Sequence, residues 1–435
     1  MGKVKIGLIV LGSIALIGLV GAALVSKAAP EPMVRKIVVF QPGVVNESAR
    51  EALITKFGGV ITKDLPLIYG MAVLLPPSAE KALAQQAEVL RIDNDDVVFA
   101  FARPICGDGA IHPSEQCDEP GLPNCPEGQV CENCKCVTPE EPTPGPLPQT
   151  ISWGVDRIDA DLGWATSTGS GVKVAILDTG IDIDHPDLSV AGGVNVLGPF
   201  RTEKYNDDNG HGTHVAGIAA ALNNAIGVVG VAPNAELYAV KAFNRRAIGF
   251  DSDIIDGIDW CINNTTYGRM DVINMSFGGS DNTSLHQAIQ AAYNAGIVMV
   301  AAAGNNGTTD GKIVYPAKYS ETIAVSATNI DDGLAYFSSY GLEIDLAAPG
   351  QDINSTWNDG YYYVGSGTSM ATPHVVGTAA LVLADPNLKC DTDFNGICSP
   401  AEVKQRLEST AELLSGLNSD QQGSGLVDAE KAVIQ

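Results

Sequence analysis

The stretch Val172-Lys-Val-Ala-Ile-Leu-Asp178-Thr-Gly180 decides the fold class that we predict for this chain. Its segment 172–177, apolar except for Lys173, is typical of a strand buried on both faces of a sheet. Further apolar runs alternate with helical patterns, the strands at 237–242, 272–275, 297–302 and 323–327 and the helices at 211–222, 251–263, 284–295 and 369–383. This alternation predicts an α/β fold with a mostly parallel central sheet and helices on both faces.

The composition limits the classes of function. The chain has 435 residues, of which 45% are hydrophobic, so it can form two or three domains with packed cores. Asp and Glu outnumber Lys and Arg by 51 to 26, which gives a formal net charge of −25. Because binding to a phosphate backbone depends on clustered Lys and Arg, we expect no nucleic-acid partner.

The N-terminal segment, residues 1–29, predicts export. Lys3 and Lys5 precede an apolar run at 6–25, and small residues follow at Ala28 and Ala29. This pattern is typical of a signal peptide. Because twenty apolar residues can also span a bilayer, the alternative is a retained anchor that holds the protein at the cell surface.

Three further segments separate this region from the α/β domain, which we place at 149–435. Residues 35–103 predict a small α+β module, with strands at 36–40, 70–75 and 97–101 and helices at 47–57 and 78–90. Residues 104–137 form a Cys-rich module. Residues 138–148 (TPEEPTPGPLP) are rich in proline and have no apolar period, so we expect an extended linker.

The cysteines indicate disulfide bonds. Six lie in the Cys-rich module, at Cys106, Cys117, Cys125, Cys131, Cys134 and Cys136. In an exported chain they predict three bridges of unknown pairing, and zinc bound by the pair at 131 and 134 is the alternative. Cys390 and Cys398 are close enough in sequence to close a small loop. Cys261 lies in an apolar stretch and is expected to be a buried, unreactive thiol.

Residues suited to nucleophilic catalysis occur in separate segments. Asp178 follows a buried strand, His211 opens a helix between glycines, and Ser369 opens another helix. A carboxylate can orient an imidazole, which takes the serine proton so that the oxygen attacks a carbonyl carbon. Asn305, which follows a buried strand and a glycine, is placed to stabilise an oxyanion together with the Ser369 backbone N–H.

Residues 149–435 resemble the catalytic domain of subtilisin-like serine proteases. The resemblance is carried by four segments in the family's order, namely 174–180, 209–217, 301–307 and 367–374, together with 274–279. It implies a three-layer α/β fold and a serine endopeptidase that acts through an acyl-enzyme. It also assigns the acid to Asp178, the base to His211, the nucleophile to Ser369 and the oxyanion donor to Asn305.

The same resemblance implies how peptides bind. Ser276, Phe277 and Gly278 match the strand that pairs with the substrate backbone by strand addition. No acidic residue stands out near the expected specificity pocket, so we expect broad specificity for an apolar residue before the cleaved bond. His185, His214 and His374 are expected to have structural roles.

Calcium is the expected cofactor. The segment 221–233 resembles the family's calcium loop, which implies ligands from the side chains of Gln149, Asp187 and Asn224 and from the carbonyls of Leu222, Ile226 and Val228. A second candidate lies outside the usual family pattern. Residues 391–402 have the spacing of an EF-hand loop, with Asp391, Asp393, Asn395, the Ile397 carbonyl and Glu402 as ligands.

Residues 35–103 resemble the inhibitory propeptide of this family. The resemblance implies a self-processing zymogen that is cut near Phe101 or Ala102, with the propeptide acting as an intramolecular inhibitor. The expected protein is thus a secreted, monomeric, calcium-stabilised protease of protein or peptide substrates. The alternative is a cell-surface binding protein that uses the Cys-rich module on an inactive protease scaffold.

Overall fold

A computed structural model describes residues 31–43, 46–100, 148–307 and 309–434, together with the backbone of 130–132 and 135–137. Its centre is a seven-stranded sheet in the order β10-β12-β9-β14-β16-β17-β18. The strands are Val190–Asn195, Glu236–Lys241, Lys173–Asp178, Val272–Met275, Val298–Ala302, Ile323–Thr328 and Leu346–Pro349 in that order. Every neighbouring pair is parallel, which confirms the predicted sheet.

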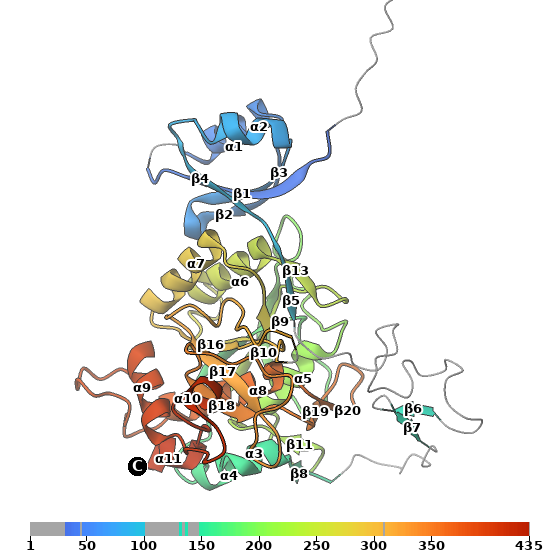
Figure 1. The fold of residues 1–435 in the computed structure, drawn as a ribbon, viewed down its shortest axis with the longest axis vertical. Helices are drawn as coiled ribbons and strands as arrows, with labels where there is room; N and C mark the ends of the chain where they lie inside the picture. The colour runs from blue at the N-terminus through green and yellow to red at the C-terminus, as the bar shows by residue number, and fades with distance from the viewer. Residues whose placement is uncertain are drawn as a thin grey trace, which may run out of the picture. The chain divides into compact units, whose positions relative to one another are not determined.

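Helices cover both faces of this sheet, as Figure 1 shows. On β9, Val174 and Ile176 join the apolar core that contains α5 (His211–Ala220) and α8 (Thr368–Leu383). The alternate residues Ala175 and Leu177 join the core that contains α6 (Asp251–Asn263) and α7 (Thr283–Asn294). Because successive strand residues point to opposite faces, burial on both faces requires the unbroken apolar runs seen in the sequence. The predicted three-layer α/β fold is confirmed.

The leading module has a four-stranded antiparallel sheet in the order β2-β3-β1-β4. Its elements are β1 (Val34–Phe40), α1 (Glu47–Lys56), β2 (Val60–Leu65), η1 (Pro66–Ile68), β3 (Gly70–Leu75), α2 (Pro77–Leu83) and β4 (Val89–Asn94). One face of the sheet packs on α1 and α2 in a core of its own. The other face contributes Ile37, Val39 and Leu65 to the core that contains α6 and α7.

Two predictions for this module were inaccurate. The expected helix at 78–90 ends at Leu83, and 89–94 is strand β4, because this segment pairs with β1 in register Ile37↔Asp93. Strand β2 was not predicted at all. Its sequence VITKDL mixes charged and apolar residues, and its position is determined by pairing with β3.

The described ranges contain further short elements. They are β6 (Val130–Glu132), β7 (Lys135–Val137), β8 (Thr150–Ile151), α3 (Trp153–Arg157), α4 (Ala160–Gly163), β11 (Val228–Val229), β19 (Ile353–Thr356), β20 (Tyr362–Gly365), α9 (Pro400–Thr410), α10 (Ser419–Gln422) and α11 (Ala429–Ile434). Strands β19 and β20 form an antiparallel pair before α8. In the described ranges no helix has the length and apolarity needed to cross a bilayer, and the run at 6–25 lies outside those ranges.

The cysteines whose side chains are described agree with expectation. Cys390 and Cys398 form a disulfide with their Cα atoms 5.5 Å apart. Cys261 is a buried free thiol, and burial raises its pKa, so it is unreactive near neutral pH. The six cysteines of 104–137 lie outside the described side chains, so their pairing remains a prediction.

Candidate active site

The residues predicted to be the acid and the base are brought together at the carboxyl end of the sheet. Asp178 is the last residue of β9 and His211 is the first residue of α5, and both are buried. The His211 Nδ1 lies 2.8 Å from Asp178 Oδ1. The Thr179 backbone N–H also donates to Asp178 Oδ1, at 2.7 Å. The carboxylate therefore fixes the ring's orientation and favours the tautomer with its proton on Nδ1.

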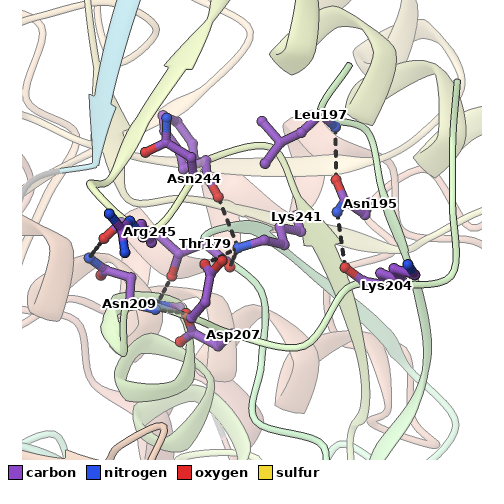
Figure 2. Close-up of polar contacts among 12 residues, drawn as sticks. Thr179, Asn195, Leu197, Lys204, Asp207, Asn209, Lys241, Asn244 and Arg245 are labelled. Atoms are coloured by element: carbon purple, nitrogen blue, oxygen red, sulfur yellow. Dashed lines mark hydrogen bonds and ion pairs between the residues drawn. The ribbon is translucent and has the colours of Figure 1, made fainter. Parts of the chain in front are cut away.

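The loop before α5 holds His211 in place. Asp207 accepts hydrogen bonds from the backbone N–H groups of Asn209, Gly210 and Thr213, and Asn209 Oδ1 accepts one from the His211 N–H. Gly210 has φ of 115°, and a Cβ there would lie 2.1 Å from a Trp357 ring atom. Figure 2 shows Asp207 and Asn209 within this network. Only glycine fits the position before His211.

Ser369 is the second residue of α8, and a reciprocal pair of hydrogen bonds holds it. Its hydroxyl donates to the Ser276 carbonyl at 3.1 Å, and the Ser276 hydroxyl donates to the Ser369 carbonyl at 2.9 Å. The Asn274 side chain donates to the Ser276 hydroxyl. Because Ser276 directly follows β14 and β14 lies beside β9, these contacts place Ser369 near the strand end that carries Asp178.

Asn305 has its carboxamide oriented by the start of α8. Its Oδ1 accepts hydrogen bonds from the Thr368 N–H at 3.0 Å and from the Thr368 hydroxyl at 3.1 Å. These two donors fix the oxygen, so the Asn305 NH₂ group is left to donate elsewhere. The N–H of Ser369, in the first turn of α8, has no partner within the helix. The Asn305 NH₂ group and the Ser369 N–H have the chemistry needed to stabilise an oxyanion.

A strand of the leading module occupies the expected substrate position. Strand β5 (Val97–Ala100) pairs antiparallel with β15 (Phe277–Gly278) on one side and with β13 (Ile248–Phe250) on the other. The sequence predicts that a substrate pairs with 276–278, and in the structure β5 pairs with Phe277 and Gly278. Strand β13 was not predicted, because three residues with a central glycine carry no strand pattern. The Phe277 ring is fully buried and packs on Phe243, so Phe277 pairs with the peptide through its backbone.

Two other histidines are buried and structural, as expected. Burial lowers the pKa of His214 and of His374 to about 4, so both are neutral at neutral pH. His214 Nε2 lies 2.9 Å from the Tyr363 carbonyl, and His374 Nδ1 lies 2.8 Å from the Met370 carbonyl. His185, the third, accepts a hydrogen bond from the Asp187 N–H at Nδ1, and its Nε2 lies 3.1 Å from the Tyr361 carbonyl.

The predicted ligands of the first calcium site converge. Gln149 Nε2 lies 2.8 Å from the Leu222 carbonyl and 3.2 Å from the Val228 carbonyl. Asp187 accepts hydrogen bonds from the Asn224 side chain and from the Val228 N–H, at 2.8 and 2.9 Å. Burial raises the pKa of Asp187 against the opposing effect of these hydrogen bonds. Ile226 is tied to this cluster through its N–H, which donates to Asn224 Oδ1.

The loop at 391–402 brings its three carboxylates together. One oxygen from each of Asp391, Asp393 and Glu402 lies within 4.8 Å of the others. Hydrogen bonds from Ser399 and Thr392 lower the pKa of Glu402 to about 2. Asn395 donates to Asp393, while the Ile397 N–H donates to Asn395 Oδ1. The Cys390–Cys398 bridge closes the first part of this loop.

Comparison with known proteins identifies close relatives. A family model described as the subtilase family matches residues 169–425. The chain is 49% identical over 288 residues to subtilisin E of Bacillus subtilis (strain 168), which covers 65% of this chain and 71% of that protein. It is 48% identical over 288 residues to a subtilisin of Bacillus pumilus, covering 65% of this chain and 99% of that protein. It is 46% identical over 287 residues to Subtilisin Savinase of Lederbergia lenta, with shares of 65% and 99%.

Proposed function

This chain belongs to the subtilase family of serine endopeptidases, and from that premise we propose that Asp178, His211 and Ser369 are its catalytic triad. The observation that carries the proposal is the buried 2.8 Å contact between Asp178 and His211. This contact lies at the end of β9, which is next to β14 in the sheet. Ser276, the residue after β14, contacts Ser369.

The proposed reaction proceeds through an acyl-enzyme. His211 Nε2 takes the proton from the Ser369 hydroxyl, and Ser369 Oγ forms a bond to the carbonyl carbon of the peptide. The resulting oxyanion accepts hydrogen bonds from the Asn305 NH₂ and the Ser369 N–H. As the C–N bond breaks, His211 gives the proton to the leaving amine. Water then hydrolyses the ester by the same route, and Asp178 stabilises the imidazolium in both halves.

Substrates are proposed to bind as a strand between β13 and β15. Strand β5 supports this, because its backbone pairs with both partners in the manner of an added strand. Main-chain pairing is independent of side-chain identity, which suits broad specificity. We assign a preference for an apolar residue before the cleaved bond. The segments 276–279 and 301–304, which we expect to line the specificity pocket, have no charged side chain.

The leading module is proposed to be an inhibitory propeptide. While β5 lies between β13 and β15, a substrate cannot pair with either strand. Self-cleavage near Phe101 or Ala102 would break the covalent link between β5, which stays with the leading module, and the catalytic domain. These two residues lie outside the described ranges. With the apolar run at 6–25, the proposal extends to a secreted zymogen.

Calcium is proposed at both loops. The ion at the first site would be held by six oxygen ligands: Gln149 Oε1, the side chains of Asp187 and Asn224, and the carbonyls of Leu222, Ile226 and Val228. The Gln149 side-chain amide would have to flip, so that Oε1 takes the place of Nε2 beside the carbonyls. Those carbonyls already face one atom of Gln149, so the donor set fits a hard cation. A bound Ca²⁺ would neutralise the buried Asp187 and join the segment before α3 to the core.

The second site is the loop at 391–402, whose oxygen ligands are Asp391, Asp393, Asn395, the Ile397 carbonyl and Glu402. The carboxylates already lie together, and the Asn395 side chain contacts Asp393. A cation there would offset the repulsion between the carboxylates and stabilise the turn before α9.

The test compares the full chain with two single variants in the presence of calcium. Ser369→Ala removes the proposed nucleophile. Ser366→Ala is the matched control. Ser366 lies three residues before Ser369, and its hydroxyl contacts Asp352 instead of a residue of the proposed triad. We expect the wild type and Ser366→Ala to lose mass at the predicted cut and to hydrolyse a peptide p-nitroanilide, while Ser369→Ala does neither. Equal activity in Ser369→Ala would refute the assignment of the triad.

A further inference from the structure

Lys241 is a buried cation directly behind the proposed triad. It is the last residue of β12 and pairs in register with Asp178, the last residue of β9. Its side chain is only 5% exposed. A lysine that deeply buried is stable as a cation only if acceptors surround its ammonium group. The acceptors therefore indicate what Lys241 holds together.

The three N–H groups of the ammonium each have one acceptor. The Nζ lies 2.5 Å from the Thr179 carbonyl, 2.5 Å from Asp208 Oδ1 and 3.1 Å from the Phe243 carbonyl. Figure 2 shows Lys241 reaching between the segment of Thr179 and the loop of Asp207 and Asn209. Since all three donors are used, the head group has a single defined position.

Each acceptor belongs to a different part of the site. Thr179 follows the proposed acid and donates its N–H to the Asp178 carboxylate, and its hydroxyl accepts the Gly212 N–H. Asp208 lies in the loop that ends at His211. Phe243 leads into β13, and its own N–H donates to the Asp178 carbonyl. One ammonium group thus joins the acid strand, the base loop and the substrate strand.

We propose that Lys241 is a positioning residue that clamps the acid turn to the loop carrying the base, and so sets the geometry between Asp178 and His211. The inference rests on the proposed triad. Lys241 does not reach the substrate: its contacts are to backbone carbonyls and to one carboxylate, all behind the acid and the base.

The charge of Lys241 also acts on the base. The charged groups of these segments are the carboxylates of Asp178, Asp207 and Asp208, the ammonium of Lys241 and the exposed Arg245 and Arg246. His214 on the same helix stays neutral, since burial lowers its pKa to about 4. Without Lys241 the carboxylates stabilise a protonated His211 more strongly, whereas without Asp208 the ammonium opposes protonation more strongly.

The test uses three variants of the full, processed enzyme. Lys241→Met removes the ammonium but keeps a long side chain. Asp208→Asn removes its partially exposed counter-charge and leaves both carbonyl contacts. Lys204→Met is the matched control, because its exposed side chain lies in the neighbouring loop, where only its backbone carbonyl accepts a hydrogen bond. A covalent serine reagent titrates the active sites, so kcat refers to folded enzyme alone.

We expect Lys241→Met to lower kcat for a peptide p-nitroanilide by roughly 10- to 100-fold per active site. It should move the acid limb of the kcat/KM profile up by about 0.3–1 pH unit. Asp208→Asn should move that limb down, and Lys204→Met should change neither quantity.

Two results would overturn the proposal. One is a Lys241→Met enzyme with fewer titratable sites but an unchanged kcat and pH profile per site, which means that Lys241 only supports folding. The other is an acid limb that stays fixed, or moves up, in Asp208→Asn. The Ser369→Ala variant keeps the two hypotheses separate. If it is active, the triad assignment fails; if it is inactive while Lys241→Met behaves like the control, only the role of Lys241 fails.

Discussion

The ion pair between Lys63 and α6 gives a quantitative prediction for docking of the leading module. Lys63 lies on β2 and is 5% exposed. Its ammonium is 2.5 Å from Asp253 Oδ1 and 3.5 Å from Asp256 Oδ2, and it also donates to the Val196 carbonyl. All three acceptors belong to the catalytic domain. Replacing Lys63 by Met therefore removes a buried cation from the contact between the two domains.

The magnitude follows from the burial of the partner. Removing one member of a buried ion pair typically costs 3–5 kcal/mol, because the other charge is left in a poorly solvated site. Burial already raises the pKa of Asp253 against the opposing effect of Lys63, so the carboxyl group can take up a proton once Lys63 is gone. Protonation limits the cost to about 3 kcal/mol, which corresponds to roughly 150-fold weaker docking.

The assay measures inhibition of the processed enzyme by a separate fragment of residues 31–102, with a peptide p-nitroanilide as the reporter. Lys36→Met is the matched control. It removes the same charge from the same fragment, but its partners Glu80 and Asn94 lie within the leading module. We expect the inhibition constant to rise roughly 150-fold for Lys63→Met relative to Lys36→Met. A ratio below about fivefold, with equal circular dichroism of both fragments, would refute the reasoning.

Three further predictions concern pH, the oxyanion and the disulfide. Burial and a neighbouring carboxylate raise the pKa of Asp251 to about 8. The docked complex therefore keeps a proton on Asp251 that the separated parts release above about pH 4, so docking should weaken as the pH rises toward 8. In Asp251→Asn the inhibition constant should depend less on pH across this range. Asn305→Asp keeps an acceptor for Thr368 but loses the NH₂ donor. In stopped assays we expect kcat to fall at least roughly 10²–10³-fold, the range known for an oxyanion donor of subtilisin. An unchanged kcat would exclude Asn305 as an oxyanion donor. Replacing Cys390 and Cys398 by Ala opens a nine-residue loop, and denaturant unfolding of an inactive variant should show a loss of about 2.6 kcal/mol through the unfolded chain's entropy, whereas no loss would exclude that mechanism.

Several features could be predicted from the sequence because they depend on local pattern. A strand buried on both faces needs an unbroken apolar run, and 174–177 and 298–302 have one. Asp178 follows such a run, so its place at the carboxyl end of the sheet follows from chain direction alone. Glycine before His211 likewise reflects a local requirement, the positive φ of Gly210.

Other features depend on partners far away in the chain. Residues 89 and 90 lie at the end of the predicted helix at 78–90, but pairing with β1 makes 89–94 a strand. Strand β13 exists because β5 pairs with it. Neither pairing has a signal in its own segment, because backbone hydrogen bonds between strands do not depend on side-chain identity.

By itself, the sequence determined the fold class, the order of the chemical groups and which residue we propose as the nucleophile, since these depend on periodicity and on residue type. Only the tertiary structure determined which charges are buried and what they hold. Lys63 and Lys241 are ordinary lysines in the sequence, and each lies buried among acceptors contributed by distant segments. The physical reason is that desolvation and Coulomb interaction depend on distances through space, which exist only after the strands and helices have packed.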